Sequence, residues 1–142
     1  MATTLTFTSA PFIQVTSFTA SDTTVAKTIL TADAVYARRL YGISIWTDES
    51  VAKDVAIHLS DGTSTWELTT IAVPINAGNT NAILPVDVFT NSQMTPIVKQ
   101  RDASGALYLN IPIGWSLKLA YNTTMSALPK IANVTVIGET YA

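Results

Sequence analysis

The sequence contains no cysteine and only one histidine, His58, among its 142 residues. Without cysteine, the chain can form neither a disulfide framework nor a thiolate metal site. A lone histidine needs carboxylates to complete a zinc site, and it needs a nucleophile and an orienting acid to act as a general base. The sequence also lacks a Gly-x-Ser-x-Gly segment and a glycine-rich phosphate loop. These absences predict a protein that is not an enzyme and binds no metal or cofactor.

Charge is also scarce, because only 13% of residues are charged, against roughly 25% in typical soluble domains. The eight lysines and arginines are scattered, and Arg38-Arg39 is the one adjacent pair, so we expect no nucleic-acid binding. No apolar run approaches the length of a membrane span, which argues against a membrane partner. Residues 1–8 lack the basic start and apolar core of a signal peptide, so we expect synthesis in the cytoplasm.

Together, threonine, valine and isoleucine make up a large part of the sequence, with more than 20 threonines. These β-branched residues suit a pleated surface, and no useful stretch has the helical period. Short runs alternate with turn residues every 8–12 positions, as in sandwiches and barrels. The sequence therefore predicts an all-β fold of eight or nine strands, an antiparallel two-sheet β-sandwich. We favour a jelly roll over an immunoglobulin-like domain.

The best-defined supersecondary element is a hairpin. Residues 55–59 alternate cleanly with their apolar side chains inward, and residues 66–73 form the returning strand. Asp61-Gly62 lies between them and favours the positive φ angles of a type I′ turn. The sequence therefore predicts a two-residue turn at this position.

Glycine and proline mark irregular points in the other strands. Gly42 lies within the long run 35–46 and predicts a bulge or a close backbone approach. Pro85 reduces residues 82–89 to an edge strand or a broken strand. Pro11 is expected to interrupt the first apolar run.

The remaining candidates for chemistry are acids and tryptophans. Asp48, Glu49 and Asp54 cluster in one turn, and we interpret them as solvated caps, with a single calcium ion as the alternative. Trp66 shares the phase of its strand with Leu68, which predicts that its ring is buried. The three tryptophans also suggest a sugar-stacking platform, although large aromatic residues in a small sandwich are more often core or interface.

Residues 1–20 are predicted to form an extended N-terminal arm or first strand, ahead of a sandwich domain at 21–142. The phenylalanines of this arm are more apolar than a free terminus requires, and we expect it to add to a neighbouring subunit by strand addition. Trp46 points opposite to the inward residues of its strand, which favours a partner contact. The candidate partner-contact residues are Phe7, Phe12, Phe18, Arg38, Arg39 and Trp46.

Several segments, taken together, give the chain a family resemblance. They are KTILTA (27–32), ISIWT (43–47), VAIHLSDG (55–62), IAVP (71–74), LYLNIPIGWSLK (107–118) and VTVIGETY (134–141). In this pattern, which spans about residues 24–141, the sequence resembles the capsid decoration, or cement, proteins of tailed bacteriophages.

The resemblance implies a structural virion protein without enzymatic activity, made in the host cytoplasm and located on the capsid surface. It implies a homotrimer that binds the major capsid protein and stabilises contacts between its subunits. Low charge and the missing catalytic residues agree with this interpretation. Two alternatives stay open: another virion component, such as a tail, fibre or head–tail joining protein, and a carbohydrate-binding β-sandwich module.

Overall fold

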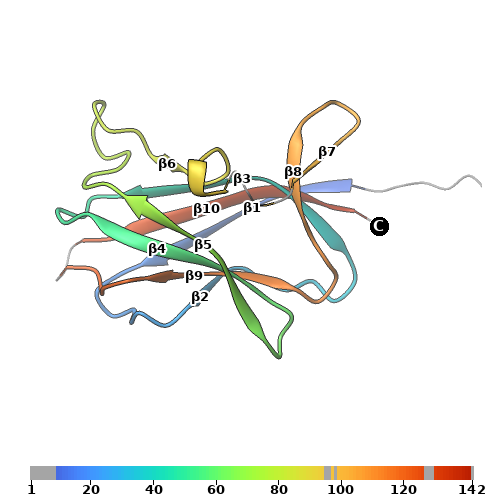
Figure 1. The fold of residues 1–142 in the computed structure, drawn as a ribbon, viewed down its shortest axis with the longest axis horizontal. Helices are drawn as coiled ribbons and strands as arrows, with labels where there is room; N and C mark the ends of the chain where they lie inside the picture. The colour runs from blue at the N-terminus through green and yellow to red at the C-terminus, as the bar shows by residue number, and fades with distance from the viewer. Residues whose placement is uncertain (1–8, 95–96, 98, 127–129, 142) are drawn as a thin grey trace, which may run out of the picture.

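The computed structural model describes residues 9–94, 97, 99–126 and 130–141 (Figure 1). Their regular structure consists of β-strands and one short 3-10 helix, η1. The elements are β1 (Ser9–Phe18), β2 (Lys27–Leu30), β3 (Ala37–Thr47), β4 (Lys53–Ser60), β5 (Thr65–Val73), β6 (Val86–Asp87), η1 (Ser92–Met94), β7 (Gln100–Arg101), β8 (Leu107–Ile111), β9 (Ser116–Tyr121) and β10 (Ala132–Tyr141).

The strands form two antiparallel sheets that pack face to face. The first sheet has the order β1-β10-β3-β8-β7, with β6 also paired to β3, and the second has the order β2-β9-β4-β5. Four strands of the first sheet, β1-β10-β3-β8, face the four of the second. This eight-stranded arrangement of two Greek keys is the jelly roll. The structure thus confirms the predicted all-β fold and the jelly-roll topology.

The core lies between the sheets and comes from the inward positions of each strand. Ile45 and Val134 of the first sheet and Ile57 and Leu119 of the second are all fully buried. Their spacing follows the two-residue period of a strand, because alternate side chains point to opposite faces. Phe18 closes one end of this layer, where its ring meets the Tyr121 ring edge-on at 5.3 Å.

The predicted hairpin is confirmed, because β4 and β5 pair directly. Its turn differs from the prediction, since the loop covers 61–64 and only Gly62 in it has a positive φ, of 92°. A type I′ turn requires positive φ at both central residues. Instead, the Asp61 carboxylate accepts hydrogen bonds from the N–H groups of Thr63 and Ser64, at 2.8 and 2.7 Å, and this side-chain cap closes the loop.

Trp66 is 46% exposed, so the prediction that its ring is buried is wrong. Trp66 pairs with Leu59 next to the hairpin loop, and its ring stacks on the Trp115 ring. Ile57 pairs with Thr69 and the next residue, His58, pairs with Glu67, which leaves Leu68 as the extra residue of a β-bulge. A bulge interrupts the strict alternation of a strand.

The long strand β3 contains the second irregularity, and Gly42 predicted it correctly. Ile137 of β10 pairs with Gly42 and Gly138 pairs with Leu40, so Tyr41 is the bulged residue. A Cβ atom on Gly42 would lie 3.1 Å from Cγ1 of Ile137, which confirms the close approach. The bulge matters for the site described below, because it sets the direction of the Tyr41 side chain.

Of the predictions made for the two prolines, one is confirmed and the other is wrong. Pro85 lies just before β6, which has only two residues, so the predicted broken strand is confirmed. Pro11, by contrast, does not interrupt its strand, because it lies inside β1 opposite Glu139. β1 is an edge strand with β10 on one side, and a proline is tolerated there when its nitrogen faces away from the neighbour.

The interpretation of the acidic turn as solvated is wrong for Glu49, because its side chain is almost completely buried. Its carboxylate accepts hydrogen bonds from the Ser50 N–H at 2.9 Å, and from the N–H and hydroxyl of Ser126. Burial alone would raise the pKa of Glu49, but these hydrogen bonds outweigh it and leave the pKa below its ordinary value. Glu49 is therefore a buried cap that fixes the loop before β10.

Candidate functional site

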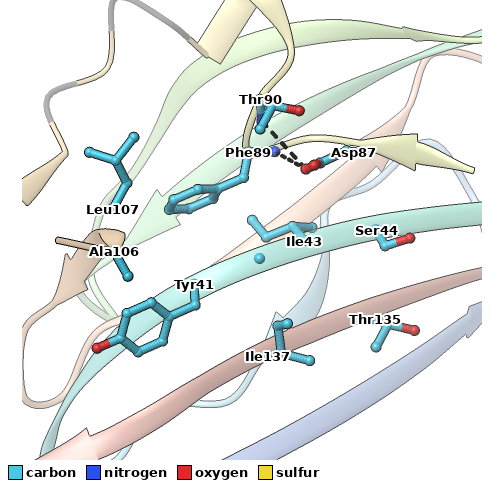
Figure 2. A pocket seen from close by; sticks show the side chains of 11 residues that line it. Tyr41, Ile43, Ser44, Asp87, Phe89, Thr90, Ala106, Leu107, Thr135 and Ile137 are labelled. Carbon is cyan, nitrogen blue, oxygen red and sulfur yellow. Dashed lines mark hydrogen bonds between the residues drawn. The ribbon is translucent and has the colours of Figure 1, made fainter. Parts of the chain in front are cut away.

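A hollow of about 530 Å³ lies on the outer face of the first sheet, the face turned away from the second sheet (Figure 2). Its floor is formed by β3 and β10, one wall by the segment after β6, and the other wall by the β7–β8 hairpin. The lining residues are Tyr41, Gly42, Ile43, Ser44, Asp87, Phe89, Thr90, Ala106, Leu107, Thr135 and Ile137. Most of this lining is apolar, and Asp87 is its one formally charged member.

The first wall is fixed to β3 by backbone and side-chain hydrogen bonds. The Val88 N–H donates to the Ile43 carbonyl at 2.9 Å. The Asp87 carboxylate accepts the N–H groups of Phe89 at 3.0 Å and Thr90 at 3.4 Å, so it caps the turn instead of facing a ligand. Phe89 is consequently held against the floor, as Figure 2 shows.

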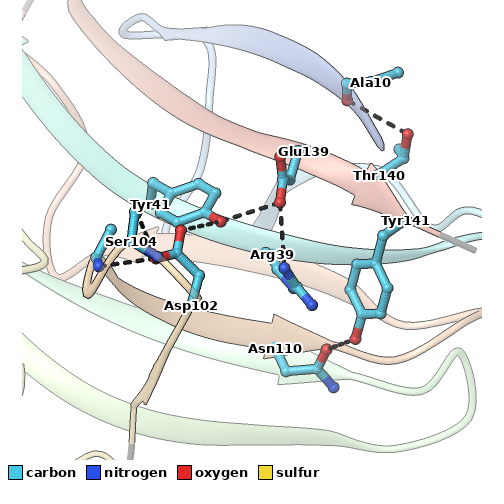
Figure 3. Close-up of polar contacts among 10 residues, drawn as sticks. Ala10, Arg39, Tyr41, Asp102, Ser104, Asn110, Glu139, Thr140 and Tyr141 are labelled. Atoms are coloured by element: carbon cyan, nitrogen blue, oxygen red, sulfur yellow. Dashed lines mark hydrogen bonds and ion pairs between the residues drawn. The ribbon is translucent and has the colours of Figure 1, made fainter. Parts of the chain in front are cut away.

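The second wall is attached through Tyr41, the bulged residue of β3. Its hydroxyl lies 2.9 Å from the Asp102 carboxylate, in the β7–β8 loop, and 3.0 Å from the Glu139 carboxylate on β10 (Figure 3). A phenol has one proton, so it donates to one carboxylate at a time. The other Asp102 oxygen accepts from Ser104 and Ala106 and holds the loop in a tight turn.

The pKa values of this group reflect its hydrogen bonds. Hydrogen bonding from the Ser104 side chain, followed by Tyr41 and nearby N–H groups, lowers the pKa of Asp102 to about 2. Burial, followed by the hydrogen bonds to Asp102 and Glu139, raises the pKa of Tyr41 to about 12. The phenol therefore keeps its proton at neutral pH and acts as a hydrogen-bond donor, which suits an anchor for the hairpin.

Exposed aliphatic side chains continue from the hollow to the edge of the sheet. Leu107 and Ile137 line the hollow and are each about two-fifths exposed. Ile13 of β1 lies directly opposite Ile137 and is 72% exposed, and Val15 is 58% exposed. We call these four side chains and the hollow the apolar face. A contiguous exposed patch of this kind usually marks an interaction site.

Phe12 and Phe18, two of the candidate contact residues in the predicted arm, lie on the side of β1 opposite to Ile13 and Val15. Residues 9–18 pair with β10 of the same chain, Phe18 is buried in the core, and Phe12 is half-buried against it. Phe7 lies outside the described residues. The exposed neighbours Ile13 and Val15 were missed, although strict alternation within the run would have separated them from the two phenylalanines.

The adjacent arginines diverge because successive residues of β3 point to opposite faces. Arg38 is almost completely buried, and its guanidinium donates to the carbonyls of Thr31 and Trp115, so it ties β3 to the loop before β9. Arg39 lies between the rings of Tyr108 and Tyr141, with its guanidinium carbon 4.9 and 4.5 Å from their centroids. Glu139 lies 3.5 Å from Arg39, at the border of the apolar face (Figure 3).

Trp46 is half-buried on the outer side of β3, under the loop before β6. The Thr47 N–H donates to the Ala77 carbonyl at 2.9 Å and holds this loop down. A Cβ atom on Gly78 would lie 2.7 Å from the Trp46 ring, so glycine is needed there for the loop to pass. Partner contact by Trp46, as by the arm and the arginines, stays a prediction.

Histidine and carboxylate side chains form no candidate metal site elsewhere in the described residues. His58 lies opposite Glu67 and Lys118 on the outer face of the second sheet. Across the described residues, no group of three or more histidine or carboxylate side chains is arranged to hold a metal ion, the 48–54 turn included. No helix in the same residues is long and apolar enough to cross a membrane.

No family model matches the sequence, and no curated protein matches it. Among solved structures, the chain is similar to a pentameric capsid protein isolated from metagenomic phage sequences, with a TM-score of 0.36 and 17% identity. The match covers 90% of this chain and 59% of that protein, so the chain spans less than two thirds of its length. The assignment of the fold therefore depends on the strand order itself.

Proposed function

We propose that this chain is a structural component of a phage particle and acts by binding other virion subunits through its apolar face. The observation that best supports the proposal is the patch formed by Leu107, Ile137, Ile13 and Val15 around a neutral hollow. Folding needs apolar side chains on the inner faces of the sheets, and it does not need them here. Such a patch is typical of a protein–protein contact.

Two further observations agree with this proposal. The sequence resembles phage decoration proteins over six segments, and jelly rolls are common among viral capsid proteins. Lectins and cupins share the jelly roll, so the function is proposed from the apolar face and not from the fold alone. The finer form of the proposal is that the chain binds the outer surface of the capsid and stabilises contacts between major capsid subunits.

Purified particles of the phage that encodes the chain provide the direct test. The proposal expects the chain in many copies per particle by mass spectrometry, and as ordered density on the outside of the capsid by electron microscopy. Particles that lack the chain should release DNA at a lower temperature than complete particles. Absence of the chain from purified particles would contradict the proposal. Density on the tail or connector would instead support the alternative of another virion component.

The homotrimer that the resemblance implies also stays a prediction. Light scattering of the purified chain measures it directly, since three chains of 15.2 kDa each give a distinct mass. No enzymatic activity is expected, and this too stays a prediction.

A carbohydrate-binding module is the second candidate function, and one observation favours it. The Trp66 ring is nearly half exposed and stacks on the Trp115 ring, with centroids 5.5 Å apart and planes 19° apart. A rigid exposed indole is a suitable platform for the apolar face of a sugar. Titration with cell-surface oligosaccharides should quench tryptophan fluorescence in the unmodified chain and fail to do so in Trp66→Ala, if this function is correct.

A further inference from the structure

β1 leaves one of its two edges unpaired. It pairs with β10 along its whole length, and no strand of the described chain lies on its other side. In an antiparallel ladder, residues alternate between those that turn both backbone groups toward the neighbour and those that turn both away. A long edge strand of this kind is a template for pairing with another strand.

Two hydrogen bonds show which residues of β1 turn away from β10. The Ala10 carbonyl accepts from the Thr140 hydroxyl on β10, so the backbone groups of Ala10, an even-numbered residue, point toward β10. The Ser17 carbonyl instead accepts from Lys27 Nζ at 2.7 Å, on the outer side. By alternation, the odd-numbered residues Pro11, Ile13, Val15 and Ser17 direct their backbone groups to the free edge.

Pro11 and Ser17 complement each other in an unusual way. Proline has no N–H, so Pro11 offers the free edge only an acceptor. The carbonyl of Ser17 is already bonded to Lys27, so Ser17 offers the edge only a donor. Between them, Ile13 and Val15 each offer one donor and one acceptor that find no partner within the described chain.

We propose that β1 pairs antiparallel with β1 of a second copy of this chain, about a twofold axis at Gln14. Ile13 then lies opposite the partner's Val15, and each donates to the other's carbonyl. Pro11 lies opposite the partner's Ser17, whose N–H donates to the Pro11 carbonyl. The nitrogen of Pro11, which has no proton, faces the partner's Ser17 carbonyl, which is already bonded to Lys27. The outward backbone groups of residues 11–17 are therefore all satisfied.

Neighbouring registers leave groups unpaired. If Val15 faced itself, Ile13 would lie opposite the partner's Ser17, and the Ile13 N–H would meet a carbonyl already bonded to a lysine. If Ile13 faced itself, Pro11 would lie opposite the partner's Val15, whose carbonyl would lack a donor. Each unmatched buried group costs about 1–3 kcal/mol, so the Gln14 axis is favoured.

The side chains favour the same contact. Ile13 and Val15 point to one side of the sheet and are the two most exposed aliphatic residues of β1. In the proposed register, they form cross-strand pairs with their counterparts, and such pairs stabilise a sheet. The two first sheets become one continuous sheet with a joined apolar face. This contact does not depend on the proposed virion role.

Cysteine cross-linking tests the register, because the chain contains no cysteine of its own. Gln14 faces its counterpart as a non-hydrogen-bonded pair with Cα atoms about 4.5 Å apart, within the range that a disulfide spans. Under mild oxidation, Gln14→Cys should therefore give a covalent dimer. Thr16→Cys, on the same face of β1, is the matched control and should cross-link at least tenfold less, because its counterpart lies roughly 13 Å away. Equal cross-linking by both, or none by Gln14→Cys, would overturn the proposal.

The mass of the unmodified chain provides an independent readout. Light scattering at about 100 µM should give twice the 15.2 kDa chain mass, or an even multiple of it. Val15→Pro removes a donor from the free edge while keeping the pairing with β10, as Pro11 does, so this variant should lose the twofold contact and keep its circular dichroism spectrum. A mass of three chains would support the homotrimer that the resemblance implies and would overturn the twofold contact, as would a mass of one chain.

Discussion

The two sheets present very different outer faces, although their inner faces are alike. The outer face of the first sheet has aliphatic side chains around a hollow, including Leu107 and Ile137. The outer face of the second sheet has His58, Lys118 and Glu67, with alanines between them. Since a sandwich needs only apolar inner faces, the apolar outer face is not required by the fold. The difference favours the outer face of the first sheet as the surface for the proposed contact with other subunits.

The largest expected effect tests the similarity of the inner faces. Ile45 and Ile57 are fully buried, one on each sheet, and truncating either to alanine should lower the free energy of unfolding by about 2–5 kcal/mol. Ser44→Ala, on the outer face of β3, should change it by less than about 0.5 kcal/mol. Urea unfolding followed by fluorescence measures all three. A cost below about 1 kcal/mol for either isoleucine would show that its sheet does not share the common core.

The next effect tests the difference between the outer faces. Leu107→Asp should weaken binding to particles that lack the chain at least tenfold, because burying an aliphatic side chain contributes about 1.5–3 kcal/mol. Ala72→Asp places the same charge on the exposed outer side of β5 and should leave binding unchanged. Co-sedimentation over a range of concentrations gives both affinities. If the two variants bind equally well, the apolar face is not the binding surface.

A smaller effect concerns the wall of the hollow. Tyr41→Phe removes the hydroxyl that bonds to Asp102 and Glu139, and it should lower the free energy of unfolding by about 1 kcal/mol. Tyr36→Phe is the matched control, since Tyr36 is exposed and outside this group. Amide exchange should also be faster in the β7–β8 hairpin of the Tyr41 variant alone. Equal exchange in both variants would rule out the anchor.

The smallest effect is a pH dependence. The pKa of Asp102 is lowered to about 2 in the folded chain, below its ordinary value of 3.8. A lowered pKa stabilises the fold above the ordinary value, and this contribution is lost as the pH falls through about 2. Asp102→Asn should therefore show a shallower loss of stability between pH 5 and pH 2 than the unmodified chain, in urea midpoints measured at each pH. Parallel pH profiles would show that Asp102 does not anchor the loop.

Local patterns predicted much of the fold. The alternation in residues 55–59, the bulge at Gly42 and the broken strand at Pro85 were all correct, because each depends on the backbone preferences of a few neighbouring residues. The predictions for Pro11 and Trp66 failed because the outcome depends on distant parts of the chain. Pro11 is tolerated only because β1 is an edge strand, and the Trp66 ring stacks on Trp115, a contact that the alternation of its own strand does not reveal.

The candidate site was less predictable than the fold. Large aromatic and charged residues were selected from the sequence, yet Phe18 and Arg38 are buried within the chain itself. The exposed residues Ile13 and Val15 are ordinary strand residues whose direction becomes clear only once β1 pairs with β10. The burial of Glu49 likewise depends on Ser126, which lies 77 positions further along the chain.

The pairing of β1 with β10 also has a consequence for synthesis. Ser17 and Asn133, joined by a hydrogen bond between these strands, are 116 positions apart. At roughly 5–20 residues per second, a ribosome needs on the order of ten seconds to make the partner after β1 has emerged. During that interval both edges of β1 lack their neighbour, and Ile13 and Val15 lie in the newly made chain. We therefore expect β1 to be open to aggregation, or to binding by chaperones, until β10 has been made.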